Sequence, residues 1–106
     1  MAEMYIDFSS LTAKGSKLLS GKENGRAAYT FFNLSAADEN TRLIIKGDDD
    51  LVISNSYFLG MFEKIFRIFK TKDELLQHID FNSLRPTNRD ELMRGINRGF
   101  QKNSYL

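Results

Sequence analysis

The residues best suited to chemistry stand in one run, Ser54-Asn55-Ser56, directly after the short apolar segment 51–53. A serine at the start of a helix suits a phosphate, because unpaired amide donors and the positive end of the helix dipole both stabilise an anion there. The same polar residues can instead cap the helix, since a side-chain oxygen accepts a hydrogen bond from a first-turn amide. Ser56 is therefore a candidate phosphoacceptor, and Ser54, Asn55 and Ser56 are alternatively helix caps.

The other reactive side chains form no complete catalytic arrangement. Residues 48–50 are three consecutive aspartates, which converge poorly on one divalent cation and favour a solvated turn. His78 is the only histidine, no serine or cysteine nucleophile motif accompanies it, and one histidine alone makes a poor metal site, so we expect a strand-edge or surface residue. The segment 15–22 lacks the spacing of a P-loop. We therefore expect no enzyme, no metal and no cofactor.

Basic residues gather near the C-terminal end of the sequence. Arg94, Arg98 and Lys102 stand at successive intervals of four, so a helix places them on one face, and Arg85 and Arg89 precede them. Such a face suits RNA, DNA or an acidic protein, or it is simply the solvated side of an amphipathic helix. The candidate partner-binding residues are Tyr57, Arg94, Arg98 and Lys102.

Composition limits the class of protein. A chain of 106 residues with 42% hydrophobic and 27% charged residues suits one globular domain with one core. The formal net charge of +1 argues against a strong nonspecific nucleic-acid binder. Apolar runs are much shorter than the roughly 20 residues that span a bilayer, and the first residues lack the pattern of a secretion signal. We expect no membrane association and a cytoplasmic location.

The hydrophobic pattern predicts a small layered α/β domain, with a mixed β-sheet packed against about three main helices. Apolar runs predict strands at residues 4–8, 41–46, 51–53 and 78–81. The second of these is predicted to be buried on both faces, because its apolar run is continuous. Residues 9–24 are expected to be a loop with a helical turn at 11–19. Helical spacing predicts helices at residues 25–37, 54–69, 73–77 and 87–100, followed by a frayed tail.

Two of these helices begin with a capping-box pattern. Thr71 precedes Glu74 by three residues, and Asn88 precedes Glu91 by three. The apolar stripe of the central helix consists of Phe58, Phe62, Ile65 and Phe69, widened by Tyr57, Met61, Phe66 and Ile68. In the helix at 25–37 the predicted buried face consists of Ala27, Ala28, Phe31, Phe32 and Leu34, with the two alanines allowing a close approach to the sheet.

These motifs resemble those of the STAS-like domains of unknown function found in bacteria and mobile elements. The resemblance rests on four motifs and on the final helix. The motifs are Gly25-Arg26-Ala27-Ala28 at the start of a helix, Val52-Ile53 at the end of a strand, the step Ser54-Asn55-Ser56-Tyr57-Phe58 into an aromatic helix, and the later strand Ile79-Asp80-Phe81-Asn82. It covers roughly residues 25–100. It implies a single domain over residues 1–106, with a variable segment at 1–24, a core at 25–101 and a tail at 102–106.

The resemblance also implies a function. In related anti-sigma-factor antagonists a partner kinase phosphorylates a serine at the start of the helix after the central strand, and this controls partner binding. The matching position here is Ser56. The sequence departs from that pattern, with Asn55 in place of a first serine, Ser54 in place of an aspartate and Tyr57 in place of a glycine.

Two functional hypotheses follow. The first is a non-enzymatic, STAS-like regulatory module that binds a partner protein, such as a kinase-like ATPase, near the start of the central helix. The second is a small inhibitor encoded by a phage or mobile element, which blocks a host defence complex by protein or nucleic-acid mimicry or contact through the basic last helix. The oligomeric state stays open.

Overall fold

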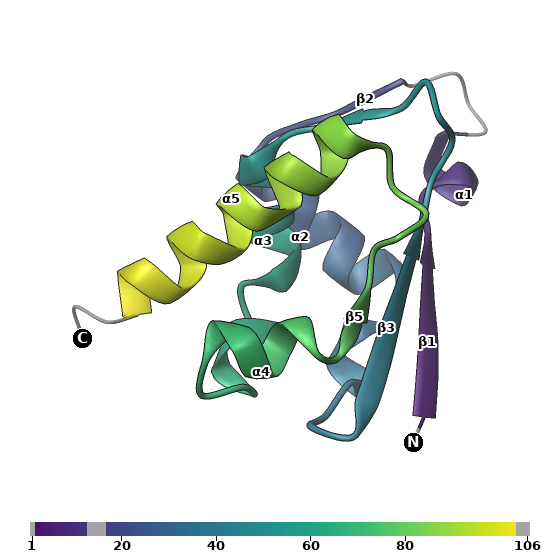
Figure 1. The fold of residues 1–106 in the computed structure, drawn as a ribbon. Helices are drawn as coiled ribbons and strands as arrows, with labels where there is room; N and C mark the ends of the chain where they lie inside the picture. The colour runs from purple at the N-terminus through teal and green to yellow at the C-terminus, as the bar shows by residue number, and fades with distance from the viewer. Residues whose placement is uncertain (1, 13–16, 104–106) are drawn as a thin grey trace.

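The computed structural model describes residues 2–12 and 17–103, which form two small parallel sheets and five α-helices (Figure 1). The predicted layered α/β architecture is confirmed, but the described strands form two sheets with parallel pairing only, and not one mixed sheet. The strands are β1 (Ala2–Asp7), β2 (Leu18–Leu19), β3 (Thr41–Lys46), β4 (Val52–Ile53) and β5 (Ile79–Asp80). The α-helices are α1 (Ser9–Thr12), α2 (Lys22–Phe31), α3 (Asn55–Phe62), α4 (Lys72–Leu76) and α5 (Pro86–Asn103). Two 3₁₀ helices, η1 (Leu34–Ala36) and η2 (Ile65–Arg67), follow α2 and α3 along the chain.

The larger sheet has the order β1-β3-β5, and β2 pairs with β4 in a separate ladder. Leu43 and Ile45 on the central strand β3 are buried, whereas Ile44 between them is half-buried. The prediction that this strand is buried on both faces is therefore wrong, because helices cover one face of the sheet and leave the other open (Figure 1). In β4, Ile53 is buried but Val52 is exposed, so this strand is also covered on one side.

The N-terminal half of α2 lies close to α3 because glycines meet at the contact. A Cβ added at Gly25 would lie 2.0 Å from the Tyr57 carbonyl oxygen, and one added at Gly60 would lie 2.1 Å from that of Lys22. The predicted buried face of this helix is therefore correct only in part. Ala28 and Leu34 are buried and Phe32 is half-buried, but Ala27 and Phe31 are exposed, since the two glycines turn another side of the helix toward α3.

Helix α3 supplies the centre of the core. Every residue from Tyr57 to Phe62 is buried, as expected for a helix that is apolar on all sides. The helix ends at Phe62 instead of continuing to residue 69, yet the predicted stripe stays buried through η2 as far as Phe69. The Phe58 and Phe62 rings stack with their centroids 6.5 Å apart.

The last third of the chain follows the predicted order. Thr71 caps α4, and its hydroxyl accepts a hydrogen bond from the Glu74 amide at 3.1 Å, as predicted. Helix α5 begins at Pro86, a residue favoured in the first helical turn because it has no amide hydrogen. It continues to Asn103, so the predicted frayed tail starts too early, and its last three residues lie outside the described part. None of the described helices has the length and apolar character needed to cross a membrane.

The predicted loop at 9–24 contains more structure than expected. Helix α1 and strand β2 both lie within it, and residues 13–16 fall outside the described part. Strand β2 pairs in parallel with β4, with Leu18 opposite Val52 and Leu19 opposite Ile53. This pairing places β2 directly beside the turn that leads into α3.

Candidate functional site at the start of helix α3

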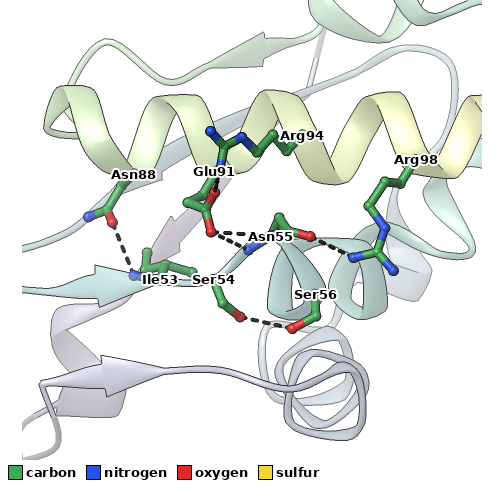
Figure 2. Close-up of polar contacts among 8 residues, drawn as sticks. All are labelled: Ile53, Ser54, Asn55, Ser56, Asn88, Glu91, Arg94 and Arg98. Carbon is green, nitrogen blue, oxygen red and sulfur yellow. Dashed lines mark hydrogen bonds and ion pairs between the residues drawn. The ribbon is translucent and has the colours of Figure 1, made fainter.

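The turn between β4 and α3 is capped by Ser54. The Ser54 backbone is extended, and its hydroxyl oxygen accepts a hydrogen bond from the Tyr57 amide at 3.2 Å. Asn55 and Ser56 are the first two residues of the helix itself. The Ser56 hydroxyl lies 3.0 Å from the Ser54 hydroxyl, and both side chains lie on the side of the turn away from α5 (Figure 2). Of the three predicted caps, Ser54 is therefore the one whose side chain pairs with a first-turn amide.

Helix α5 holds the other side of this turn through Asn55 (Figure 2). One carboxylate oxygen of Glu91 accepts hydrogen bonds from the Asn55 backbone amide at 3.1 Å and from its side-chain amide at 3.2 Å. The Asn55 side-chain oxygen accepts a hydrogen bond from Arg98 at 2.5 Å. The second Glu91 oxygen pairs with Arg94 at 3.1 Å. The Glu91 carboxylate thus supplies negative charge at the positive end of α3, which stabilises the helix.

Asn88 belongs to the same connection, not to a capping box. It is buried, its side-chain amide donates to the Leu51 carbonyl at 2.8 Å, and its side-chain oxygen accepts from the Ile53 amide at 3.0 Å. The predicted capping box of Asn88 and Glu91 is therefore wrong. Because α5 starts at Pro86, both residues lie inside the helix, and their side chains pair with β4 and α3.

Tyr57 is a buried residue that also lines a groove beside the turn, so its role in partner binding stays a prediction. Only 2% of the residue is exposed, and its ring lies edge-on to Phe8 with centroids 6.1 Å apart. Burial raises the pKa of the Tyr57 hydroxyl to about 12, so the group is protonated near neutral pH. Tyr57 is covered because α3 is buried on every side, including the side that carries this residue.

The basic residues of α5 are largely engaged within the chain. Arg94 and Arg98 are exposed on the same helix, as predicted, but they contact Glu91 and Asn55. The Lys102 side chain lies outside what the structure describes. Arg85 donates to the Asp49 carbonyl at 2.8 Å, and the Arg89 Nε atom is buried without a hydrogen-bond partner in the described residues. Arg85 thus holds the 48–50 turn, and Arg94 and Arg98 support the contact between α5 and the start of α3.

The aspartates at 48–50 form an exposed turn, as predicted. Asp50 pairs with Lys17 at 2.9 Å, and this hydrogen bond lowers the pKa of the Asp50 carboxyl. No group of three potential metal-binding side chains occurs within the described ranges 2–12 and 17–103. His78 is half-buried, with one ring nitrogen 2.9 Å from the Glu74 carbonyl and its ring against Phe69.

A groove of about 390 Å³ lies beside the α3 turn. The Ser54 amide donates to the Leu19 carbonyl at 2.9 Å, so the turn is joined directly to one wall of the groove. At its rim, Leu18 is 59% exposed and Phe31 is 56% exposed. The lining residues are Leu11, Leu18, Leu19, Ser20, Asn24, Ala27, Ala28, Phe31 and Tyr57.

Sequence reasoning missed this groove, because it treated residues 9–24 as a loop. The pair Leu18-Leu19 in an otherwise polar segment was the available signal. Two adjacent leucines in a strand point to opposite sides, so one can face the core and the other solvent. Here Leu19 is half-buried, and Leu18 is exposed.

Comparisons with known proteins add no relative. No model of a protein family, no curated protein and no solved structure matches this chain. The groove and the α3 turn are therefore the structural features from which a function can be inferred.

Proposed function

We propose that this chain is a non-enzymatic regulatory module of the STAS-like type, which binds a partner protein beside the start of α3. The observation that carries the proposal is the apolar groove next to the Ser54–Ser56 turn. Its rim exposes Leu18 and Phe31. Burial of these two large apolar side chains under a partner would remove apolar surface from water and so favour binding. Val52 extends this patch, because it is exposed and lies opposite Leu18 in the β2·β4 ladder.

The composition of the groove favours a protein over a charged small ligand. Most of its lining side chains are apolar, and its polar members are Ser20, Asn24 and the hydroxyl-bearing Tyr57. An aromatic residue and a leucine at the rim match the apolar centre of a typical protein interface, where a few such side chains supply most of the binding energy. We infer that a partner inserts an apolar side chain between Leu18 and Phe31.

Ser56 lies where a modification would affect such a contact. It directly precedes the groove residue Tyr57, and its hydroxyl is on the side of the turn away from α5 (Figure 2). A phosphate there would add nearly two negative charges beside an apolar contact surface, which weakens binding through desolvation. The resemblance to the antagonist family suggests a kinase-like ATPase as the partner that would perform this step.

The test begins with affinity purification of the chain from its native host, followed by titration of the purified partner. Leu18→Lys and Phe31→Lys should each weaken binding about tenfold or more, the effect expected of central interface residues. Ala36→Lys is the matched control, because this residue is exposed on η1 and is not part of the groove. Equal affinity for all three variants would show that the groove is not the contact.

A further inference from the structure

Strand β1 offers a second surface, separate from the groove. It is an edge strand of the β1-β3-β5 sheet, and no described strand pairs with its outer edge (Figure 1). The outer face of this sheet is also open, since Tyr5 is 55% exposed and Lys46 is exposed on the neighbouring strand. None of the β1 residues lines the groove. An edge of this length is a ready template for another strand.

The backbone direction of β1 can be read from one hydrogen bond. The Phe8 amide donates to the Lys46 carbonyl at 2.9 Å, so Phe8 directs its backbone groups toward β3. Backbone direction alternates along a strand, so Glu3, Tyr5 and Asp7 direct theirs toward the open edge. The Asp7 carbonyl already accepts a hydrogen bond from Ser10 at 2.7 Å. Glu3 and Tyr5 therefore offer both a donor and an acceptor to an added strand, and Asp7 offers its amide.

The side chains of the same three residues lie on the open face and follow a charge pattern. Glu3 stands opposite Arg42 on β3, and Asp7 stands opposite Lys46. Between these rows, Tyr5 stands opposite Ile44, with the Lys46 ammonium 5.2 Å from the centre of the Tyr5 ring.

The alternation continues to β5 on the far side of the sheet. There Asp80 lies 3.8 Å from Arg42. Each strand thus presents charges opposite to those of its neighbour, as favourable cross-strand pairs require.

Continuing this alternation by one strand predicts the chemistry of the occupant. We propose that the outer edge of β1 binds an extended segment of a partner protein that presents basic, apolar and basic side chains at alternate positions. The basic residues would pair with Glu3 and Asp7, and the apolar residue would lie beside Tyr5. A second copy of this chain is a poor occupant, because antiparallel pairing of two β1 strands about Tyr5 brings Glu3 against Asp7 twice.

The pattern is the same in both directions, so it suits parallel or antiparallel addition. The probe is a short, terminally blocked peptide whose centre reads Lys-Thr-Val-Thr-Lys. Titration into isotopically labelled protein, followed by NMR, should shift the amide signals of Glu3, Tyr5 and Asp7 and slow their hydrogen exchange. Two control peptides are needed, one with glutamate in place of both lysines and one N-methylated at all five central residues, because the lysine and valine amides face β1 in antiparallel addition and the threonine amides face it in parallel addition. Both should bind much more weakly, the first through charge and the second through loss of backbone donors.

Variants of the protein test the same contact from the other side. Glu3→Gln combined with Asp7→Asn removes both charges, while the asparagine keeps the acceptor for the Ser9 amide and hydroxyl. Because this variant loses two cross-strand charge pairs, the basic peptide should bind it about 2- to 30-fold more weakly than the parent chain. Asp80→Asn is the matched control, because it removes an acid from the same face at the opposite edge, and it should leave binding unchanged.

Three results would overturn the proposal. They are equal binding of the basic and acidic peptides, equal binding of the N-methylated peptide, and amide shifts centred on the groove instead of β1. The peptide comparisons use the unaltered chain, so they decide the question even where a variant folds poorly.

Discussion

At the residue level, Ser54 and Ser56 at the start of α3 differ in their hydrogen bonds. The Ser54 hydroxyl accepts from the Tyr57 amide, whereas the Ser56 hydroxyl lies against Ser54. Ser54→Ala should therefore lower the free energy of unfolding by about 0.5–2 kcal/mol, the usual cost of losing an N-cap. Ser56→Ala should cost less, because Ser56 is not the cap. Urea denaturation of both variants measures the difference, and equal losses would contradict this assignment of the cap.

Because Ser56→Ala should leave the fold nearly intact, it allows a clean test of modification at this position. We expect Ser56→Ala to bind the partner like the parent chain and Ser56→Asp to bind more weakly, since a charge there lies beside the apolar groove. Intact-mass measurement of protein from its own host, with and without phosphatase, asks whether Ser56 carries phosphate. Absence of phosphate together with equal affinity of the two variants would remove the switch hypothesis.

Asn88 is the buried polar residue that ties α5 to β4. Asn88→Ala leaves the Leu51 carbonyl and the Ile53 amide without their present partner, and each unsatisfied buried group costs about 1–3 kcal/mol. We expect a loss of at least that size in the free energy of unfolding. Asn97→Ala is the control, because Asn97 is exposed on the same helix and should change stability by about 0.5 kcal/mol or less. Similar melting curves for both variants would contradict the bracing role of Asn88.

At the element level, the closest contact in the fold is between α2 and α3. A methyl group at Gly60 would lie 2.1 Å from a backbone oxygen of α2, so Gly60→Ala must push the helices apart. The gain in helix propensity of about 1 kcal/mol does not offset such overpacking, and we expect net destabilisation of roughly 1–3 kcal/mol. At Gly99 the added methyl would meet the ring of Phe66 instead, a buried side chain whose displacement requires rotation of side-chain torsions and no movement of a helix backbone. Thermal melts should rank Gly99→Ala as the milder change.

The same two helices are joined at the surface by Arg26 and Glu63, at 2.8 Å. The hydrogen bond from Arg26 lowers the pKa of Glu63, so the ionised carboxylate is the form that the fold favours. This contribution is present above the usual carboxyl pKa of about 4.3 and is lost as pH falls through the lower folded value. The free energy of unfolding of Glu63→Gln should therefore be lower than that of the parent chain at about pH 7 and should approach it at about pH 3.

Denaturation at both pH values measures this change, and the double variant with Arg26→Gln provides the control. Once the arginine is gone, replacing Glu63 should have a much smaller pH-dependent effect on the free energy of unfolding, because only the charges of Lys22 and Arg67 then lower the pKa of Glu63. A difference between Glu63→Gln and the parent that stays constant with pH would show that the ion pair contributes nothing.

The sequence predicted elements where one local signal dominated. The strand at Thr41–Lys46, the Thr71 cap and the apolar stripe through Phe62 all came from hydrophobic period or capping pattern. It failed where a long-range contact decided the outcome. Gly25 and Gly60 set the face of α2, and a strand of two residues, β2, exists only because β4 lies beside it.

The α3 turn shows the same limit within the candidate site. The run Ser54-Asn55-Ser56 was recognisable as a helix start from its residue types alone. The different roles of Ser54, which caps α3, and Asn55, which binds α5, were not recognisable. They depend on Glu91 and Arg98, which contact Asn55 from more than thirty-five residues away in the sequence. The capping-box pattern predicted that Glu91 pairs within its own helix. Because α5 packs against α3, Glu91 instead accepts hydrogen bonds from Asn55 in α3.

At the level of the whole molecule, both sheets belong to one core. Phe8 after β1, Ile53 in β4 and Phe58 in α3 are all fully buried members of a single apolar cluster. The radius of gyration is 12.8 Å, close to the value of about 13 Å expected for a compact domain of this length. The β2·β4 ladder has two residue pairs and cannot be stable apart from that cluster.

We therefore expect the chain to unfold in one cooperative step. Far-ultraviolet circular dichroism reports the helices. With Tyr5, Tyr29 and Tyr105 replaced by phenylalanine, tyrosine fluorescence reports Tyr57, which is buried against Phe8. Because the same core holds all of these elements, the two urea transitions should coincide, and calorimetric and van't Hoff enthalpies should agree. Val52→Thr makes this exposed strand residue polar and keeps it β-branched, so it should shift the midpoint slightly without separating the transitions. An earlier transition seen by tyrosine fluorescence alone would mean that the groove side of the molecule opens independently, and binding at the groove would then be coupled to local folding.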